Sequence, residues 1–65
     1  MPTVRLTVPQ GDLTKEEKAE VVERVTDTVS NFFRERKNED VRPYVMVQIS
    51  ETSEGGYALG GEIIG

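Results

Sequence analysis

The sequence predicts an α+β fold in which two strands flank one helix, and three stretches of the chain carry that prediction. Residues 3–8 alternate polar and apolar side chains, residues 15–36 repeat apolar ones at helical spacing, and residues 44–50 are rich in β-formers. With 65 residues the chain makes one domain, residues 1–65. Because a helix separates the two strands, we expect a β-α-β unit with parallel strands.

The first strand is expected to be buried on one side only. Val4, Leu6 and Val8 fall on one face, and the polar residues between them fall on the other. Residues 9–12, Pro-Gln-Gly-Asp, have the composition of a turn that ends the strand.

The helix is expected to begin at a capping box formed by Thr14 and Glu17. From Lys15 to about Arg36, apolar residues recur every three or four positions and make one apolar face for a sheet. The residues of that face are Val21, Val22, Val25, Val29, Phe32 and Phe33.

The second strand follows Pro43, which cannot continue a helix. Residues 44–50 place Val45, Val47 and Ile49 on one face, while the alternate residues point away from the helix. The last residues, with paired glycines at 55–56 and 60–61, predict a short C-terminal hairpin or arm that reaches a neighbouring subunit.

Composition indicates that this domain does not stand alone. Only 35% of the residues are hydrophobic, and a chain this short needs disulfides, a structural metal or self-association to supplement its core. With no Cys and no His, the first is excluded and the second is improbable. We therefore expect a homo-oligomer with a multi-subunit sheet.

Charge and hydropathy exclude several classes of partner. Twelve acidic and eight basic residues give a net charge of −4, which disfavours nucleic acid. No apolar run approaches the ~20 residues of a membrane span, and the first residues lack a signal-peptide pattern. We expect a soluble, cytoplasmic protein without membrane contact.

The start of the chain carries the one unusual chemical feature. If Met1 is removed, Pro2 has a free secondary amine, and burial in an apolar site lowers the pKa of such an amine. A base near neutral pH results, in a chain without histidine. If Met1 is retained, the Pro2 nitrogen is an amide and is not basic.

Taken together, these pieces resemble the short-chain 4-oxalocrotonate tautomerase family of the tautomerase superfamily, whose fold is shared with the MIF-like proteins. The matching segments are residues 1–4, Gly11, residues 14–18, 25–27, 47–51 and 55–62. The resemblance implies a keto-enol tautomerase of a small 2-keto or enol acid, with Pro2 as general base and no metal or cofactor. It also implies a homohexamer built as a trimer of dimers.

This sequence departs from the family at two substrate-binding positions. Members that process dicarboxylates carry arginines where this chain has Asp12 and Met46, so both cationic groups are missing. Arg42, which has the strand parity of Met46, is the best replacement that the sequence offers. Arg5 and Arg36 are weaker candidates for the same role.

Three other residues are expected around Pro2 on the basis of the resemblance. Tyr57 aligns with an aromatic residue of the pocket wall, where its ring keeps the amine in an apolar setting and its hydroxyl faces a substrate oxygen. Met46 and Tyr44 are expected to line the pocket.

Two other functions stay open. One is a non-catalytic, oligomeric small-ligand-binding protein of the same fold, which the missing arginines favour. The other is a hydratase or dehalogenase acting on an unsaturated acid, which the same absence disfavours, because such reactions need a cation to polarise a carboxylate.

Overall fold

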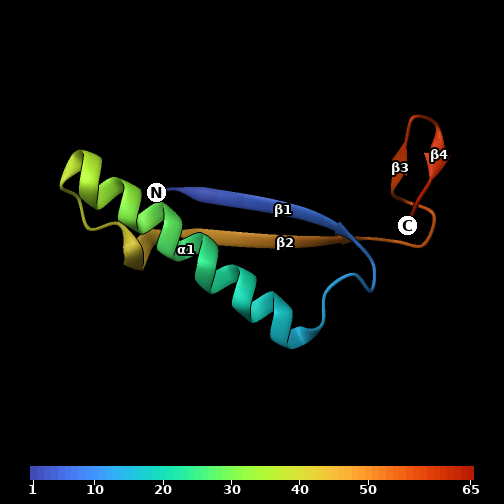
Figure 1. Ribbon diagram of the computed structural model, residues 1–65, viewed down its shortest axis with the longest axis horizontal. Coiled ribbons are helices and arrows are strands. Elements are labelled where there is room, and N and C mark those ends of the chain that lie inside the picture. The colour runs from blue at the N-terminus through green and yellow to red at the C-terminus, as the bar shows by residue number, and fades with distance from the viewer.

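The computed structural model describes residues 1–65 and confirms the β-α-β order with a C-terminal hairpin (Figure 1). Its elements are β1 (Thr3–Pro9), α1 (Lys15–Lys37), the 3-10 turn η1 (Arg42–Tyr44), β2 (Met46–Thr52), β3 (Ala58–Leu59) and β4 (Glu62–Ile63).

The two long strands pair in parallel along their whole length. The register runs from Thr3 opposite Met46 to Pro9 opposite Thr52. Along β1 the apolar side chains are partly buried on the side of α1, and the polar ones between them are exposed. The sheet therefore has an inward face toward the helix and an outward face away from it (Figure 1).

Helix α1 begins where the capping box predicts. The backbone N–H of Glu17 donates to Thr14 Oγ1 at 3.1 Å, and the Thr14 N–H donates to Glu17 Oε1 at 2.8 Å. The helix ends at Lys37, one residue beyond the prediction, because Asn38 adopts the left-handed conformation with φ 53° and its N–H donates to the carbonyl of Arg34.

The second strand begins later than the sequence predicts. Tyr44 belongs to η1 and not to β2, because its N–H donates to the carbonyl of Val41 at 2.8 Å and is not available to the sheet. Pro43, within the same turn, has no N–H to contribute to a ladder. Pairing starts at Met46 and continues to Thr52, two residues beyond the expected end.

The C-terminal hairpin turns through Gly60 and Gly61, whose φ values of 58° and 86° are readily adopted only by glycine. It projects beyond the end of the sheet where β1 and β2 finish (Figure 1). Gly65 folds back onto this end: a Cβ added there would lie 2.7 Å from the Cβ of Pro9 and 3.5 Å from that of Tyr57.

The single chain has no buried apolar core. Ser30 is its one buried residue, and Leu59 and Ile63 of the hairpin are 72% and 67% exposed. The radius of gyration is 14.7 Å, against about 11 Å for a compact chain of this length. The helix offers no stretch long and apolar enough to cross a membrane. The chain therefore leaves apolar surface uncovered on both the helix side and the hairpin.

Candidate active site

Pro2 stands immediately before β1 and is partly buried, whereas Met1 projects into solvent. The carbonyl of Pro2 accepts the N–H of Met46 at 2.9 Å. This bond continues the β1–β2 pairing by one position, so the carbonyl group of Pro2 is fixed against β2 at the end of the sheet.

Met46 and Tyr44 lie at the same end of the sheet as Pro2. Met46 is opposite Thr3 in the register, points outward and is 44% exposed. Tyr44 comes two residues earlier, in η1, and its ring is also exposed. We call this end, with Pro2, Tyr44 and Met46, the open end of the sheet.

Arg42 is directed away from the open end. Its guanidinium forms an ion pair with the carboxylate of Asp27 on α1. The argument from strand parity with Met46 does not apply, because Arg42 begins the 3-10 turn and is not in β2. Its role as a substrate ligand stays a prediction, and the single chain gives the guanidinium a different partner.

Tyr57 lies at the opposite end of the sheet from Pro2. It precedes β3, and its backbone carbonyl accepts from Ile64 at 2.8 Å and from Gly65 at 3.2 Å. Since Gly65 packs on Pro9 at the far end of β1, about seven residues of strand, or roughly 23 Å, separate Tyr57 from Pro2. One chain does not bring these two residues together.

The far end carries an ion pair between α1 and β2 that sequence reasoning missed. Lys18 Nζ lies 2.6 Å from Glu51 Oε1, joining the first turns of α1 to the end of β2. This hydrogen bond, with help from the backbone of Gly11, lowers the pKa of the Glu51 carboxyl from its ordinary value of 4.5. The sequence gives no signal for the pair, because 33 positions separate the two residues. We call this end, with Gly11, Thr14, Lys18 and Glu51, the fastened end.

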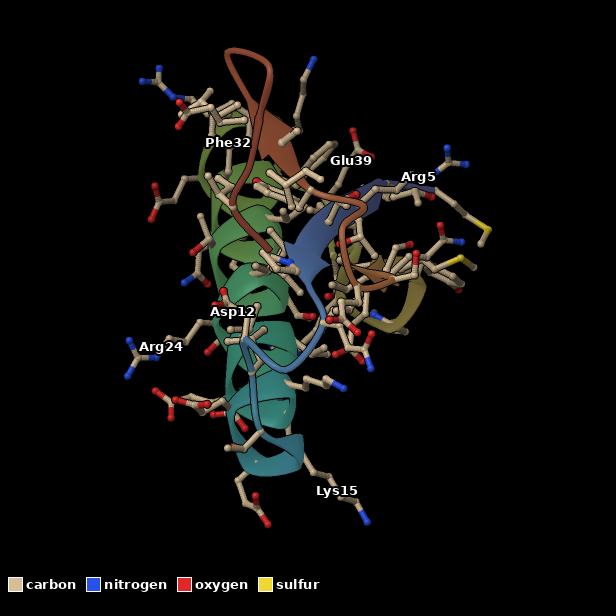
Figure 2. All side chains as sticks on the ribbon, turned by 90° about the vertical axis from the view of Figure 1, so that its right-hand side faces the viewer. Arg5, Asp12, Lys15, Arg24, Phe32 and Glu39 are labelled. Carbon is tan, nitrogen blue, oxygen red and sulfur yellow. The ribbon has the colours of Figure 1, made fainter.

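Asp12, at the position of a missing arginine, is exposed in the loop of the fastened end. Its N–H donates to the carbonyl of Pro9 at 3.2 Å. Figure 2 looks along the molecule from this side and shows Asp12 on the loop that leads into α1. The acid is thus far along β1 from Pro2 of its own chain.

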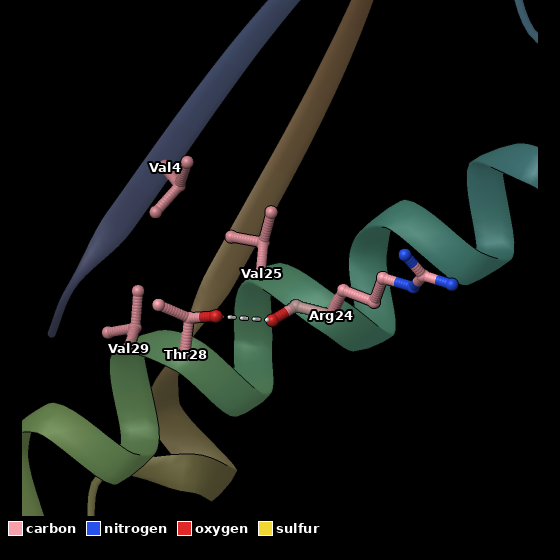
Figure 3. A pocket seen from close by; sticks show the side chains of 5 residues that line it. All are labelled: Val4, Arg24, Val25, Thr28 and Val29. Atoms are coloured by element: carbon pink, nitrogen blue, oxygen red, sulfur yellow. Dashed lines mark hydrogen bonds between the residues drawn. The ribbon is translucent and has the colours of Figure 1, made fainter.

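Two hollows mark the surface, and neither includes Pro2. An apolar groove of about 270 Å³ runs between α1 and β1, lined by Val4, Val25 and Val29 with Arg24 and Thr28 (Figure 3). An open hollow of about 310 Å³ lies near the fastened end, lined by Gln10, Gly11, Glu54 and Gly65. No three acidic side chains gather closely enough to hold a metal ion.

The fold and the sequence together define the class of protein. The family model described as tautomerase enzyme matches residues 2–65, so the chain belongs to the tautomerase family. Among solved structures it is similar to the crystal structure of DmpI from Helicobacter pylori, determined to 1.9 Å resolution, with a TM-score of 0.70 and 28% sequence identity. That similarity covers 95% of this chain and 88% of DmpI. No curated protein matches the chain.

These matches confirm the resemblance to the short-chain 4-oxalocrotonate tautomerases on which the site residues were predicted. The family match covers the chain from Pro2 to its end, and so includes both ends of the sheet.

Proposed function

We propose that this chain is a cofactor-independent isomerase that interconverts the keto and enol forms of a small 2-keto acid, with Pro2 as general base once Met1 is removed. The observation that carries the proposal is the position of Pro2 at the start of β1, partly buried and bonded to Met46, in a chain of the tautomerase family. A cytoplasmic location is part of the proposal, because initiator methionines are removed there.

The proposed reaction moves one proton. The neutral Pro2 amine takes the proton of the enol hydroxyl, and the resulting ammonium delivers it to the carbon that becomes CH₂ of the keto acid. Met46 and Tyr44 are exposed in the single chain, and once a neighbouring subunit covers them we expect these apolar side chains to disfavour the ammonium form and keep the amine neutral between turnovers. A hydrogen-bond donor is also needed at the enolate oxygen, and the Tyr57 hydroxyl is our candidate.

Assembly is a necessary part of this function. Tyr57 is far from Pro2 of its own chain, so it reaches a Pro2 amine only from another subunit. The uncovered groove between α1 and β1, and the exposed Leu59 and Ile63, are the apolar surfaces that association would bury. We propose a homohexamer, built as a trimer of dimers, in which these contacts create a dry pocket at each open end.

The test compares ketonisation of phenylenolpyruvate by the wild type, Pro2→Ala and Pro9→Ala. Alanine at position 2 leaves a primary, less constrained amine, and we expect its turnover to fall about 100-fold or more. Pro9→Ala is the matched control at the other end of β1 and is expected to keep most of the activity. Equal rates for the wild type and Pro2→Ala would contradict the proposal.

The intact mass of the wild type is measured on the same sample. A mass lacking one methionine shows that the Pro2 amine is free. A mass that includes Met1 predicts an inactive sample, and activity in such a sample would rule out Pro2 as the base.

The second candidate function is binding without turnover. Asp12 and Met46 favour it, because each replaces a guanidinium that holds substrate oxygens in related enzymes. It would be adopted if the wild type turned over no enol in a panel of substrates and Pro2 failed to react with 3-bromopyruvate. Hydration or dehalogenation of an unsaturated acid ranks below both.

A further inference from the structure

The outward face of the β1–β2 sheet carries no carboxylate, although the chain has twelve acidic residues and a net charge of −4. The exposed side chains of this face come from three register pairs: Thr3 with Met46, Arg5 with Gln48, and Thr7 with Ser50. The only acidic residue of either strand is Glu51, and it is bonded to Lys18 on the helix side. The outward face is therefore cationic within an acidic protein.

Arg5 is the one cation of this face, and it has no partner in the chain. The ion pairs of the structure join Lys18 to Glu51, Arg24 to Glu20, and Arg42 to Asp27, and none includes Arg5. Figure 2 shows Arg5 projecting from β1 on the side away from α1, whereas Arg24 points out from the helix. Arg36, the other sequence candidate, lies in the last turn of α1, where a positive charge stabilises the helix end.

Gln48 adds a second hydrogen-bond donor to this face, and Arg5 and Gln48 together are called the donor cluster. It is the register partner of Arg5, so the two side chains stand side by side on adjacent strands. Its amide nitrogen lies 3.9 Å from the sulfur of Met46, which is a weak acceptor. A guanidinium and a side-chain amide thus present N–H groups together, and neither is bonded to a carboxylate of the chain.

The donor cluster, Arg5 and Gln48, is close to the open end. Three residues of strand, or roughly 10 Å, separate the backbone of Arg5 from that of Pro2. The extended arginine side chain, and the length of an enol acid itself, can span this separation. Met46 stands diagonally between them on the same face and adds an apolar contact.

We infer that Arg5, assisted by Gln48, binds the carboxylate of the substrate and thereby replaces the arginines that are missing at Asp12 and Met46. This inference rests on the proposed function and names its specificity-determining residue. A single guanidinium with the apolar Met46 as its diagonal neighbour fits a monocarboxylate with an apolar tail better than a dicarboxylate.

The kinetic test uses two substrates with the same enol and aromatic groups, phenylenolpyruvate, which is an anion, and the enol of methyl phenylpyruvate, which is its neutral methyl ester. Arg5→Gln removes the charge, Arg5→Lys keeps the charge without the bidentate fork, and Arg34→Gln is the matched control on the helix. For the acid, we expect Arg5→Gln to lower kcat/KM by about 10- to 100-fold, mainly through KM, and Arg5→Lys to lower it less. For the ester, both variants stay within about twofold of the wild type, as Arg34→Gln does for both substrates.

Equal losses on acid and ester, or no loss on the acid, overturn the inference. If Arg5 had a purely structural role, its substitution would lower kcat/KM equally for both substrates. The ratio of the two kcat/KM values therefore separates substrate binding from a structural role. If Arg5→Gln changes the oligomeric mass measured by light scattering, the ratio of kcat/KM for acid and ester is measured in Arg5→Lys instead, and that ratio decides between the two roles.

A binding test does not depend on turnover. We expect calorimetric titration with 3-phenylpropionate to show binding to the wild type and at least about tenfold weaker binding to Arg5→Gln, with no such difference for 3-phenylpropanamide. Equal affinities, or no binding to the wild type, overturn the inference. Arg5-dependent binding without any enol turnover keeps the anion site and refutes the tautomerase. Turnover that depends on Pro2 but not on Arg5 supports the tautomerase and refutes the anion site at Arg5.

Discussion

The two ends of the parallel β1–β2 sheet differ in how their side chains are paired within the chain. At the fastened end, the capping box of Thr14 and the Lys18–Glu51 ion pair join loop, helix and strand within one chain. At the open end, Pro2 is only partly buried, and the side chains of Tyr44 and Met46 are 58% and 44% exposed. The difference teaches that the chain pairs its own side chains at one end and leaves the other end uncovered, where we propose that a neighbouring subunit completes it.

The largest effect is expected from a charge placed in the groove between α1 and β1. Val25→Asp puts a carboxylate where we propose that a second subunit packs, and burying it unpaired costs several kcal/mol. We expect the variant to be a monomer by light scattering and to lose activity at the open end. Val25→Thr, of nearly the same shape and uncharged, is the control and should still assemble. An assembled, active Val25→Asp protein would show that the groove is not an interface.

Mixed oligomers test whether two chains share one site. Pro2→Ala and Tyr57→Ala are each expected to lose activity, the first by about 100-fold and the second by about tenfold. Oligomers refolded from a mixture of the two contain some sites with an intact Pro2 from one chain and an intact Tyr57 from another. We expect such mixtures to exceed both parents in phenylenolpyruvate turnover. No gain on mixing would place both groups in one chain, against the separation across β1.

The fold was largely predictable from the sequence, because its signals are local. The alternation of Val4, Leu6 and Val8 and the spacing of Thr14 and Glu17 each depend on neighbours within a few residues, and the structure confirms both. Tyr44 was placed wrongly in the strand, because β-propensity does not reveal that its N–H bonds to Val41.

The site was less predictable, because its partners are distant in the chain or belong to another chain. Sequence spacing suggested Arg42 as a cation for the open end, but a helix one layer away supplies Asp27 as its partner. The same spacing ranked Arg5 low. Its lack of a partner becomes visible only when the register of β1 and β2 and the three ion pairs are known.

A moderate effect is expected at the fastened end from Thr14→Ala. The substitution removes the hydroxyl that accepts the Glu17 N–H, and loss of such a cap costs about 1 kcal/mol. We expect a lower midpoint of urea unfolding with unchanged kcat/KM, since the open end is not involved. Asn31→Ala removes an exposed side-chain hydrogen bond, from Arg34 to the Asn31 amide oxygen, within the helix, and as the control it should change the midpoint less. A fall in kcat/KM at constant assembly would mean that the two ends are coupled.

The smallest effect is expected from Glu51→Gln, and it depends on pH. Because Lys18 lowers the pKa of the Glu51 carboxyl in the folded chain, unfolding raises that pKa back toward 4.5. The ion pair therefore stabilises the fold above that value, and its contribution is lost as the pH falls through the lowered value of the folded state. We expect Glu51→Gln to lower the urea midpoint slightly at about pH 7 and to leave it unchanged near about pH 2. The effect is small because both side chains are about one third exposed, so water screens the pair.

The control is Glu23→Gln, an exposed helix substitution without an ion pair, which should show no such pH dependence. An equal pH dependence in both variants would mean that the ion pair of Lys18 with Glu51 does not stabilise this end of the sheet.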